Sequence, residues 1–110
     1  MTLAELKTAL EGVNSNAFVG KVAYRAFPTS AAPSLPFICF KEIESNNFVA
    51  DCQVYHKITE VDIELYSDQK DTVSEEGIES MLNNKKIIWD KSEYYIDSEN
   101  MLQIVYGIEI

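Results

Sequence analysis

Residues 61–110 read VDIELYSDQKDTVSEEGIESMLNNKKIIWDKSEYYIDSENMLQIVYGIEI, and this half of the chain decides the fold. Its first six residues alternate between apolar and polar side chains, which predicts a strand with one buried face. A polar linker at 67–71 leads to a predicted helix over 72–84. Strands are then predicted within residues 86–110. The succession of strand, helix and strands indicates a mixed α and β domain.

The helix predicted over 72–84 begins at a polar residue. Asp71 or Ser74 can cap its first turn, and Glu75 adds negative charge where the helix dipole favours it. Gly77 lowers helix stability by about 1 kcal/mol relative to alanine. The helix should therefore depend on the packing of its apolar residues, which are Ile78, Met81 and Leu82.

The end of the chain predicts three strands, at 87–90, 93–97 and 101–110, with a hairpin turn at 97–100. In the last strand every second residue is apolar. One face of that strand is therefore expected to be buried, and it consists of Leu102, Ile104, Tyr106, Ile108 and Ile110.

The first half of the chain predicts a helix over residues 2–13. Thr2 and Glu5 fit a capping box, and residues 12 and 14–16 are expected to end the helix. Its apolar stripe is Leu3, Leu6, Leu10 and Val13. Strands are predicted at 18–26 and at 37–40, the second covered on both faces because it is continuously apolar.

A turn is predicted at 44–47, followed by a long β region over 51–66. The apolar residues of this region change phase, from even positions at 54–58 to odd positions at 61–65. A strand has a period of two, so this change requires an extra residue. A bulge or bend is therefore predicted near Thr59 and Glu60.

These elements predict one α+β domain spanning residues 1–110. The expected architecture is a single α/β sandwich, with a mostly antiparallel sheet of about five strands and two helices.

The chain has 18 acidic and 9 basic residues, a net charge of −9. This balance argues against a nucleic-acid-binding surface and against docking on an anionic membrane. No stretch approaches the roughly 20 apolar residues of a membrane span, and the first residues do not resemble a signal peptide. Cys39 and Cys52 fit buried free thiols in a reducing compartment, although a disulfide between them stays open.

No catalytic or metal site is expected, and no cofactor. His56 is the single histidine, and no spacing typical of zinc or calcium ligands is present. A Cys–His pair of His56 with either cysteine is conceivable, but no motif frames it. Five carboxylates gather around the second helix, and we interpret them as a solvated helix start; they are Asp68, Asp71, Glu75, Glu76 and Glu79.

Residues 27–36 contain all three prolines of the chain and predict an exposed loop. Two interpretations stay open: a plain connector, or a loop that becomes ordered against a neighbouring subunit. In the second interpretation the interface residues are Phe27, Pro28, Pro33, Leu35 and Pro36.

The order of elements in the second half resembles the tail-terminator or tail-completion proteins of long-tailed bacteriophages and prophages. The stretches that carry the resemblance are 61–71, 94–99 and 103–106, together with the helix between them. The opening helix and the proline-rich loop fit more loosely. The resemblance lies in element order and residue class, without a catalytic signature.

This resemblance implies a non-enzymatic structural protein of the virion tail or neck, assembled in the bacterial host cytoplasm. Several copies, typically six, would form a ring on the last tail-tube ring and present a surface to the head-completion or connector protein. DNA would pass through without specific binding, and no membrane is involved. On this hypothesis the five carboxylates listed above face the lumen of the ring.

One alternative of a different class stays open. A small acidic cytosolic regulatory or inhibitor domain would bind one protein partner through its acidic face. Such a domain would stay monomeric and would bind a basic partner with strong salt dependence.

Overall fold

The computed structural model describes the backbone of residues 1–45, 48–50, 53–56 and 58–110, and the side chains of these residues except 29, 48–50 and 53–56. Five strands form one open sheet in the order β1-β2-β5-β7-β6. β1 pairs with β2 in parallel, and the other three pairings are antiparallel. The predicted α+β class, with a mostly antiparallel sheet of about five strands, is confirmed. The strand bounds are Val22–Tyr24 for β1, Phe37–Ser45 for β2, Thr59–Ser67 for β5, Trp89–Ile96 for β6 and Met101–Glu109 for β7.

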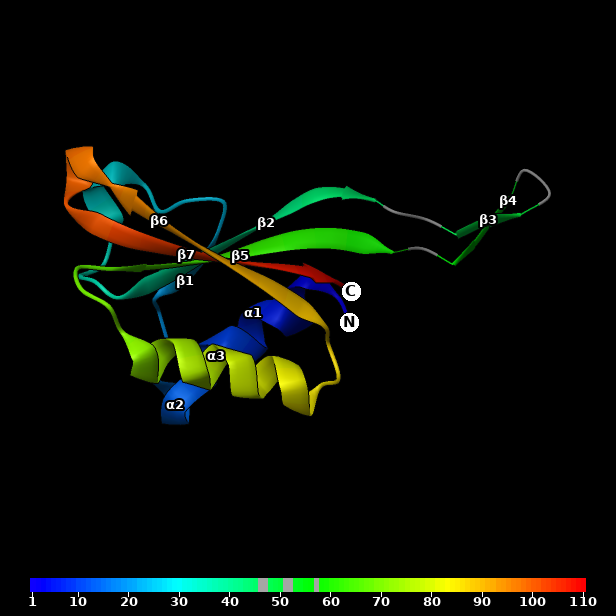
Figure 1. The fold of residues 1–110 in the computed structure, drawn as a ribbon, viewed down its shortest axis with the longest axis horizontal. Helices are drawn as coiled ribbons and strands as arrows, with labels where there is room; N and C mark the ends of the chain where they lie inside the picture. Colours follow the sequence, from blue (N-terminus) through cyan, green and yellow to red (C-terminus); the bar gives the residue numbers. More distant parts are fainter. Residues whose placement is uncertain (46–47, 51–52, 57) are drawn as a thin grey trace.

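Three helices, α1 (Leu3–Glu11), α2 (Val13–Asn16) and α3 (Thr72–Asn84), lie together on one side of this sheet (Figure 1). The capping box at the start of α1 is present: the backbone N–H of Glu5 donates to the Thr2 hydroxyl, and the Glu5 carboxylate accepts from the Thr2 N–H. The helix predicted over 2–13 ends earlier, at Glu11, because Gly12 caps it. The short α2 that follows contains left-handed backbone at Asn14 and Ser15, with φ of 53° and 59°.

The core lies between the helices and one face of the sheet. Alternation along β5 and β7 buries most of the expected residues, although Leu102 and Ile110 are only half-buried, and α1 and α3 close the layer from the other side. The fully buried side chains include Leu6, Leu10, Ile38, Ile63, Leu65, Ile78, Leu82, Ile104 and Tyr106. Met81 is only partly buried against this core. The apolar stripes predicted for α1, α3 and β7 are therefore confirmed as the faces that pack together.

Gly77 is the point where α2 packs on α3. A Cβ at this position would lie closer than 3.0 Å to side-chain atoms of both Val13 and Asn14. The side-chain amide of Asn14 also donates to the backbone carbonyl of Val73, at 3.1 Å. Glycine thus allows α2 and α3 to pack closely at this point, although it lowers the intrinsic stability of α3.

The end of the chain forms two strands where three were predicted. β6 is continuous from Trp89 to Ile96, so the predicted break between 90 and 93 is wrong. β6 pairs with β7 along its whole length. The hairpin turn at 97–100 is confirmed, as a short 3₁₀ helix, η2 (Asp97–Glu99), followed by Asn100 with φ 51°.

Beyond the paired ends of β2 and β5, a second two-stranded sheet of β3 (Phe48–Ala50) and β4 (Gln53–His56) lies at the tip of the molecule (Figure 1). We call this projection the arm. The radius of gyration is 14.8 Å, against about 13 Å for a compact domain of this length. The molecule measures 49 × 29 × 24 Å along its principal axes. The arm therefore makes the molecule longer than a compact domain.

The turn predicted at 44–47 is wrong for Glu44 and Ser45, which continue β2; positions 46 and 47 lie outside the described residues. The β region predicted over 51–66 is divided, since β4 and β5 belong to different sheets. The predicted bulge near Thr59 and Glu60 lies instead on the partner strand. The pairing of β2 with β5 shifts between Glu42 and Glu44, opposite Val61 and Glu60.

The strand predicted over 18–26 is shorter, because only Val22–Tyr24 pairs with β2. Between β1 and β2 the chain forms one turn of 3₁₀ helix, η1 (Thr29–Ala31). Phe18 precedes the strand and is buried in the core. Cys39 and Phe40 in β2 are both buried, which confirms that this strand is covered on both faces.

Candidate functional site

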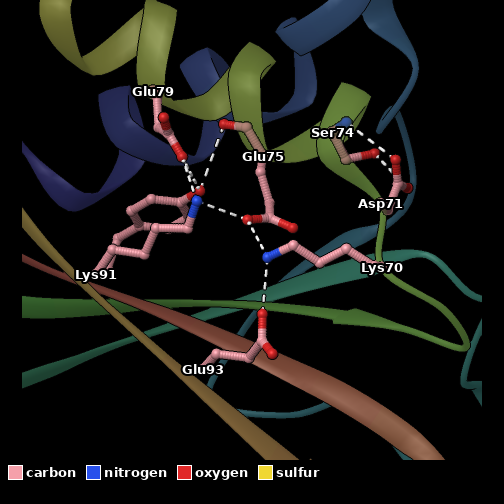
Figure 2. A network of polar contacts seen from close by, with 8 residues as sticks. Lys70, Asp71, Ser74, Glu75, Glu79, Lys91 and Glu93 are labelled. Atoms are coloured by element: carbon pink, nitrogen blue, oxygen red, sulfur yellow. Dashed lines mark hydrogen bonds and ion pairs between the residues drawn. The ribbon is translucent and has the colours of Figure 1, made fainter.

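The start of α3 is capped by Asp71. Its Oδ1 accepts from the backbone N–H of Ser74 at 3.1 Å, and its Oδ2 accepts from the Ser74 hydroxyl at 2.7 Å. Of the two residues proposed as the cap, the structure selects Asp71 (Figure 2). This carboxylate is therefore occupied in holding the first turn of the helix.

Glu75, one turn further along α3, points down toward the sheet and is only 2% exposed. Its Oε1 lies 3.0 Å from Nζ of Lys70 and 2.6 Å from Nζ of Lys91 (Figure 2). Its Oε2 is buried without a hydrogen-bond partner among the described residues. Burying a carboxylate this deeply is costly unless cationic partners such as these compensate it.

The two lysines extend this ion-pair network to three further residues. Nζ of Lys70 lies 2.7 Å from Glu93 Oε1, and Nζ of Lys91 lies 2.8 Å from Glu79 Oε2. The Tyr106 hydroxyl also donates to Glu79 Oε2, at 2.8 Å. The network thus joins the linker before α3 and two turns of that helix to β6 and β7 (Figure 2).

The charges of the network fix its protonation. Hydrogen bonds to Glu93 and Glu75 raise the pKa of Lys70. Burial alone would lower the pKa of Lys91, but its bonds to Glu75 and Glu79 raise it. Burial alone would raise the pKa of Glu79, whereas hydrogen bonds from Lys91 and Tyr106 hold it below its ordinary value. Both lysines therefore remain charged near neutral pH, and their ion pairs attach α3 to the sheet.

The interpretation of five solvated carboxylates is wrong for Glu75, which is buried, and for Glu79, which is partly buried in the network. Asp71 is half-buried and caps the helix, as one of the two predicted caps. Asp68 and Glu76 are exposed as expected. The sequence gives little indication of which carboxylates are buried. The lysines that pair with the inward-facing carboxylates of α3 come from other segments of the chain.

The proline-rich loop lies on the opposite face of the sheet from the helices. The Phe27 ring packs edge-on against Phe37, with centroids 5.4 Å apart and planes at 80°. Phe37 in turn lies 5.2 Å from the Tyr66 ring. Pro28 is exposed, whereas Pro33, Leu35 and Pro36 are half-buried. The segment expected to be an exposed loop therefore covers part of its own sheet.

Polar groups lie beneath this cover. Glu64 is 7% exposed, and Nζ of Lys41 lies 3.5 Å from its Oε2. The Tyr66 hydroxyl donates to Glu64 Oε1 at 3.1 Å and accepts from the Gln103 side chain at 2.9 Å. Burial, and then the charge of Glu64, raises the pKa of Tyr66 to about 12. These bonds satisfy the acidic group that the strand pattern had assigned to a solvated face.

Cys39 is a free, buried thiol under the same cover. Burial, and then the charge of Glu64, raises its pKa to about 11, despite a hydrogen bond from the backbone of Phe27. A thiol with so high a pKa is protonated near neutral pH and is a poor nucleophile. Cys52 and the side chain of His56, which concern the conceivable Cys–His pair, lie outside the described residues.

A row of three glutamates crosses the sheet where the arm begins. Glu44 on β2 pairs with Glu60 on β5, and Glu60 pairs with Glu109 on β7. Like charges directly opposite one another are unfavourable. Burial, and then the charges of Glu44 and Glu109, raises the pKa of Glu60. Sequence reasoning missed this row because it depends on strand register.

The sheet ends on one side in β6, an edge strand of eight residues. Tyr94 and Tyr95 on this strand are 55% and 56% exposed, and Ile88 just before it is 89% exposed. An edge strand carries backbone groups that can pair with another strand. The edge of β6 is therefore exposed and open to pairing with another strand, and it is separate from the row of three glutamates.

The described part of the chain contains no group of three or more histidine, cysteine or acidic side chains arranged to hold a metal ion. It also contains no helix with the length and apolar character needed to cross a membrane.

Comparison with models of known protein families and with curated protein sequences finds no match.

Proposed function

We propose that this chain is a structural tail-terminator or tail-completion protein of a bacteriophage or prophage. In this role several copies, typically six, form a ring that caps the tail tube and joins the tail to the head. Its partners would be other copies of itself, the tail-tube protein and the head-completion or connector protein. It would act without a cofactor or a catalytic site, in the tail or neck of the virion.

The observation that carries this proposal is that the sheet is open and bears an arm. β6 ends the sheet on one side with two half-exposed tyrosines, and the two-stranded sheet of β3 and β4 projects beyond the ends of β2 and β5 (Figure 1). A two-stranded ribbon has little stability by itself. Such an arm and such an edge fit a protein that completes its packing with other subunits, as heterologous contacts in a ring require.

The charge distribution also supports a protein that lets DNA pass. The net charge is −9, and the row formed by Glu44, Glu60 and Glu109 concentrates carboxylates on one face. Of the residues first expected in the lumen, Asp68 and Glu76 have exposed side chains suited to that place. A ring structure with both on its outer wall would contradict this placement.

The test is to measure the solution mass by light scattering over a wide concentration range, alone and with purified tail tubes. The expected result is closed rings of about six subunits, seen in negative-stain images free or at tube ends. A chain that stays monomeric and leaves tube length unchanged would contradict the proposal.

A second candidate function is a small acidic domain that binds one basic protein partner. The row of glutamates favours it, because a cationic partner would relieve the repulsion that raises the pKa of Glu60. Binding of this kind weakens strongly with salt, whereas ring contacts that are largely apolar and main-chain do not. Self-association that survives moderate salt would favour the ring, whereas a chain that stays monomeric and binds a basic partner only at low salt would favour the second function.

A further inference from the structure

Residues 26–36, which we call the strap, are held on the sheet mainly by side chains. Ladder-type hydrogen bonds fix the chain on both sides: the N–H of Arg25 donates to Phe40 O at 2.8 Å, and the N–H of Ile38 donates to Lys21 O at 2.9 Å. Between these points the described backbone–backbone bonds are local, from Ala26 to Tyr24 and from Ala31 to Pro28.

The contacts that hold the strap converge on one small face. Phe27 packs on Phe37, which packs on Tyr66, and the backbone of Phe27 bonds to the thiol of Cys39. Three of these residues lie on β2 and β5, whose positions the sheet fixes. The face is therefore held in place by the sheet. It can bind the strap of its own chain or the identical strap of another copy.

The strap is also the part of this acidic chain best suited to touch another copy. Residues 26–40 carry no charged side chain, the longest such run in the sequence. Two chains of net charge −9 repel each other, and that repulsion is smallest where neutral segments meet. An extended strap of this length, tethered at both ends, can reach about 18 Å from the sheet.

We propose that the strap is exchanged between copies, so that Phe27 of one copy packs on Phe37 and lies over Cys39 of the next. Exchange of an identical segment keeps every contact of the closed chain and adds a link between chains. Arg25, at the start of the strap, is exposed and has left-handed backbone with φ 69°, so the chain already changes direction there. This inference rests on the proposed function and gives its ring a specific contact.

The test uses disulfides that can form only between chains. One species carries Phe27→Cys, Cys39→Ser and Cys52→Ser; the other carries Cys52→Ser alone and retains Cys39. After mild oxidation of the mixture, the expected product is a mixed disulfide dimer, identified by a tag on one species. A matched control places the thiol on α3, as Val73→Cys with Cys39→Ser and Cys52→Ser, since Val73 is 69% exposed.

Docking raises the effective concentration of the thiol, so the mixed dimer should form at least about tenfold faster than with the control. Equal rates for the two pairs would mean random collision and would overturn the proposal. A variant that carries both Phe27→Cys and Cys39 provides a further test. The proposal would also be overturned if this variant forms the disulfide only within one chain and the mixture of the two species gives no mixed dimer. If circular dichroism shows that Phe27→Cys prevents folding, Pro28→Cys replaces it, because Pro28 is exposed.

The outcomes separate this inference from the proposed function. Rings on tail tubes without mixed disulfides would contradict strap exchange and would still support the ring function. Mixed disulfides in small oligomers that never bind tail tubes would support exchange and contradict the tail function.

Discussion

The two faces of the sheet differ in what covers them. On one face, α1 and α3 bury residues such as Ile63 and Tyr106 completely. On the other face, the strap covers Cys39 and Glu64, and the rest carries charged and half-exposed side chains. Stability in such a protein comes mainly from the apolar face. On the proposed function the second face makes the contacts with other molecules, and the predictions below test this division.

The largest expected effect is on the helix-covered face. Ile78→Ala removes a fully buried side chain between α3 and the sheet, and we expect a loss of about 2–5 kcal/mol in the free energy of unfolding. Tyr94→Ala on the edge strand is the matched control and should cost within about 0.5 kcal/mol. Urea unfolding followed by circular dichroism measures both, and equal losses would refute the division between the faces.

Gly77→Ala should destabilise the protein, although alanine is the better helix former. The added methyl group meets Val13 and Asn14 at less than 3.0 Å, and such overpacking costs about 1–3 kcal/mol. The control is Ser80→Ala, at an exposed position of the same helix, which should gain about 0.5 kcal/mol. A gain in thermal stability for Gly77→Ala would show that α2 does not pack closely on α3.

Lys91→Met should weaken the attachment of α3 to β6. It leaves buried Glu75 with Lys70 as its one remaining cation in the network, and it leaves Glu79 with the Tyr106 hydroxyl alone. Because Lys91 is about one-third exposed, we expect a loss of about 1–2 kcal/mol, less than for a fully buried pair. Lys7→Met, at an exposed position of α1, serves as the control, and chemical denaturation compares the two. Equal stabilities would mean that the network contributes nothing measurable.

Phe27→Ala should expose the second face without unfolding the first. We expect global stability to fall by about 1 kcal/mol, since the lost contact is one half-buried ring pair. Labelling of Cys39 by a thiol reagent should become faster, measured in a Cys52→Ser background so that one thiol reacts. Unchanged labelling together with a large loss of stability would place Phe27 in the main core.

The smallest effects concern pH, and they differ in sign. The pKa of Glu79 lies below its ordinary value of 4.5, so this group stabilises the fold above that value and the contribution is lost as pH falls through the folded pKa. The pKa of Glu60 is raised, so its repulsion destabilises the fold near neutral pH and is relieved on acidification.

Glu79→Gln should therefore lower the melting temperature near pH 7, and its difference from the wild type should shrink in acid. Glu60→Gln should raise the melting temperature near pH 7, with a difference that also shrinks in acid. Thermal melts across the range from about pH 7 to pH 4 compare the two. Shifts of the same sign for both variants would contradict the assigned environments.

Local patterns predicted the elements that depend on neighbouring residues. The capping box of Thr2 and Glu5, the cap at Asp71 and the alternation of β7 are all present. β6 was divided wrongly because Lys91 and Glu93 occupy its helix-facing positions, where a pattern method expects apolar residues. Their partners on α3 and before it are more than ten residues away, and periodicity carries no information about them.

The amino-acid sequence by itself determined the α+β class, the two main helices and which face of each is apolar. These properties follow from capping and from periods of 3.6 and 2, which act over a few residues. Only the tertiary structure decided that Glu75 is buried, that Glu44, Glu60 and Glu109 form a row, and that the strap covers Cys39. Each of these depends on strand register or on contact between distant segments, where burial and charge are set by the partner.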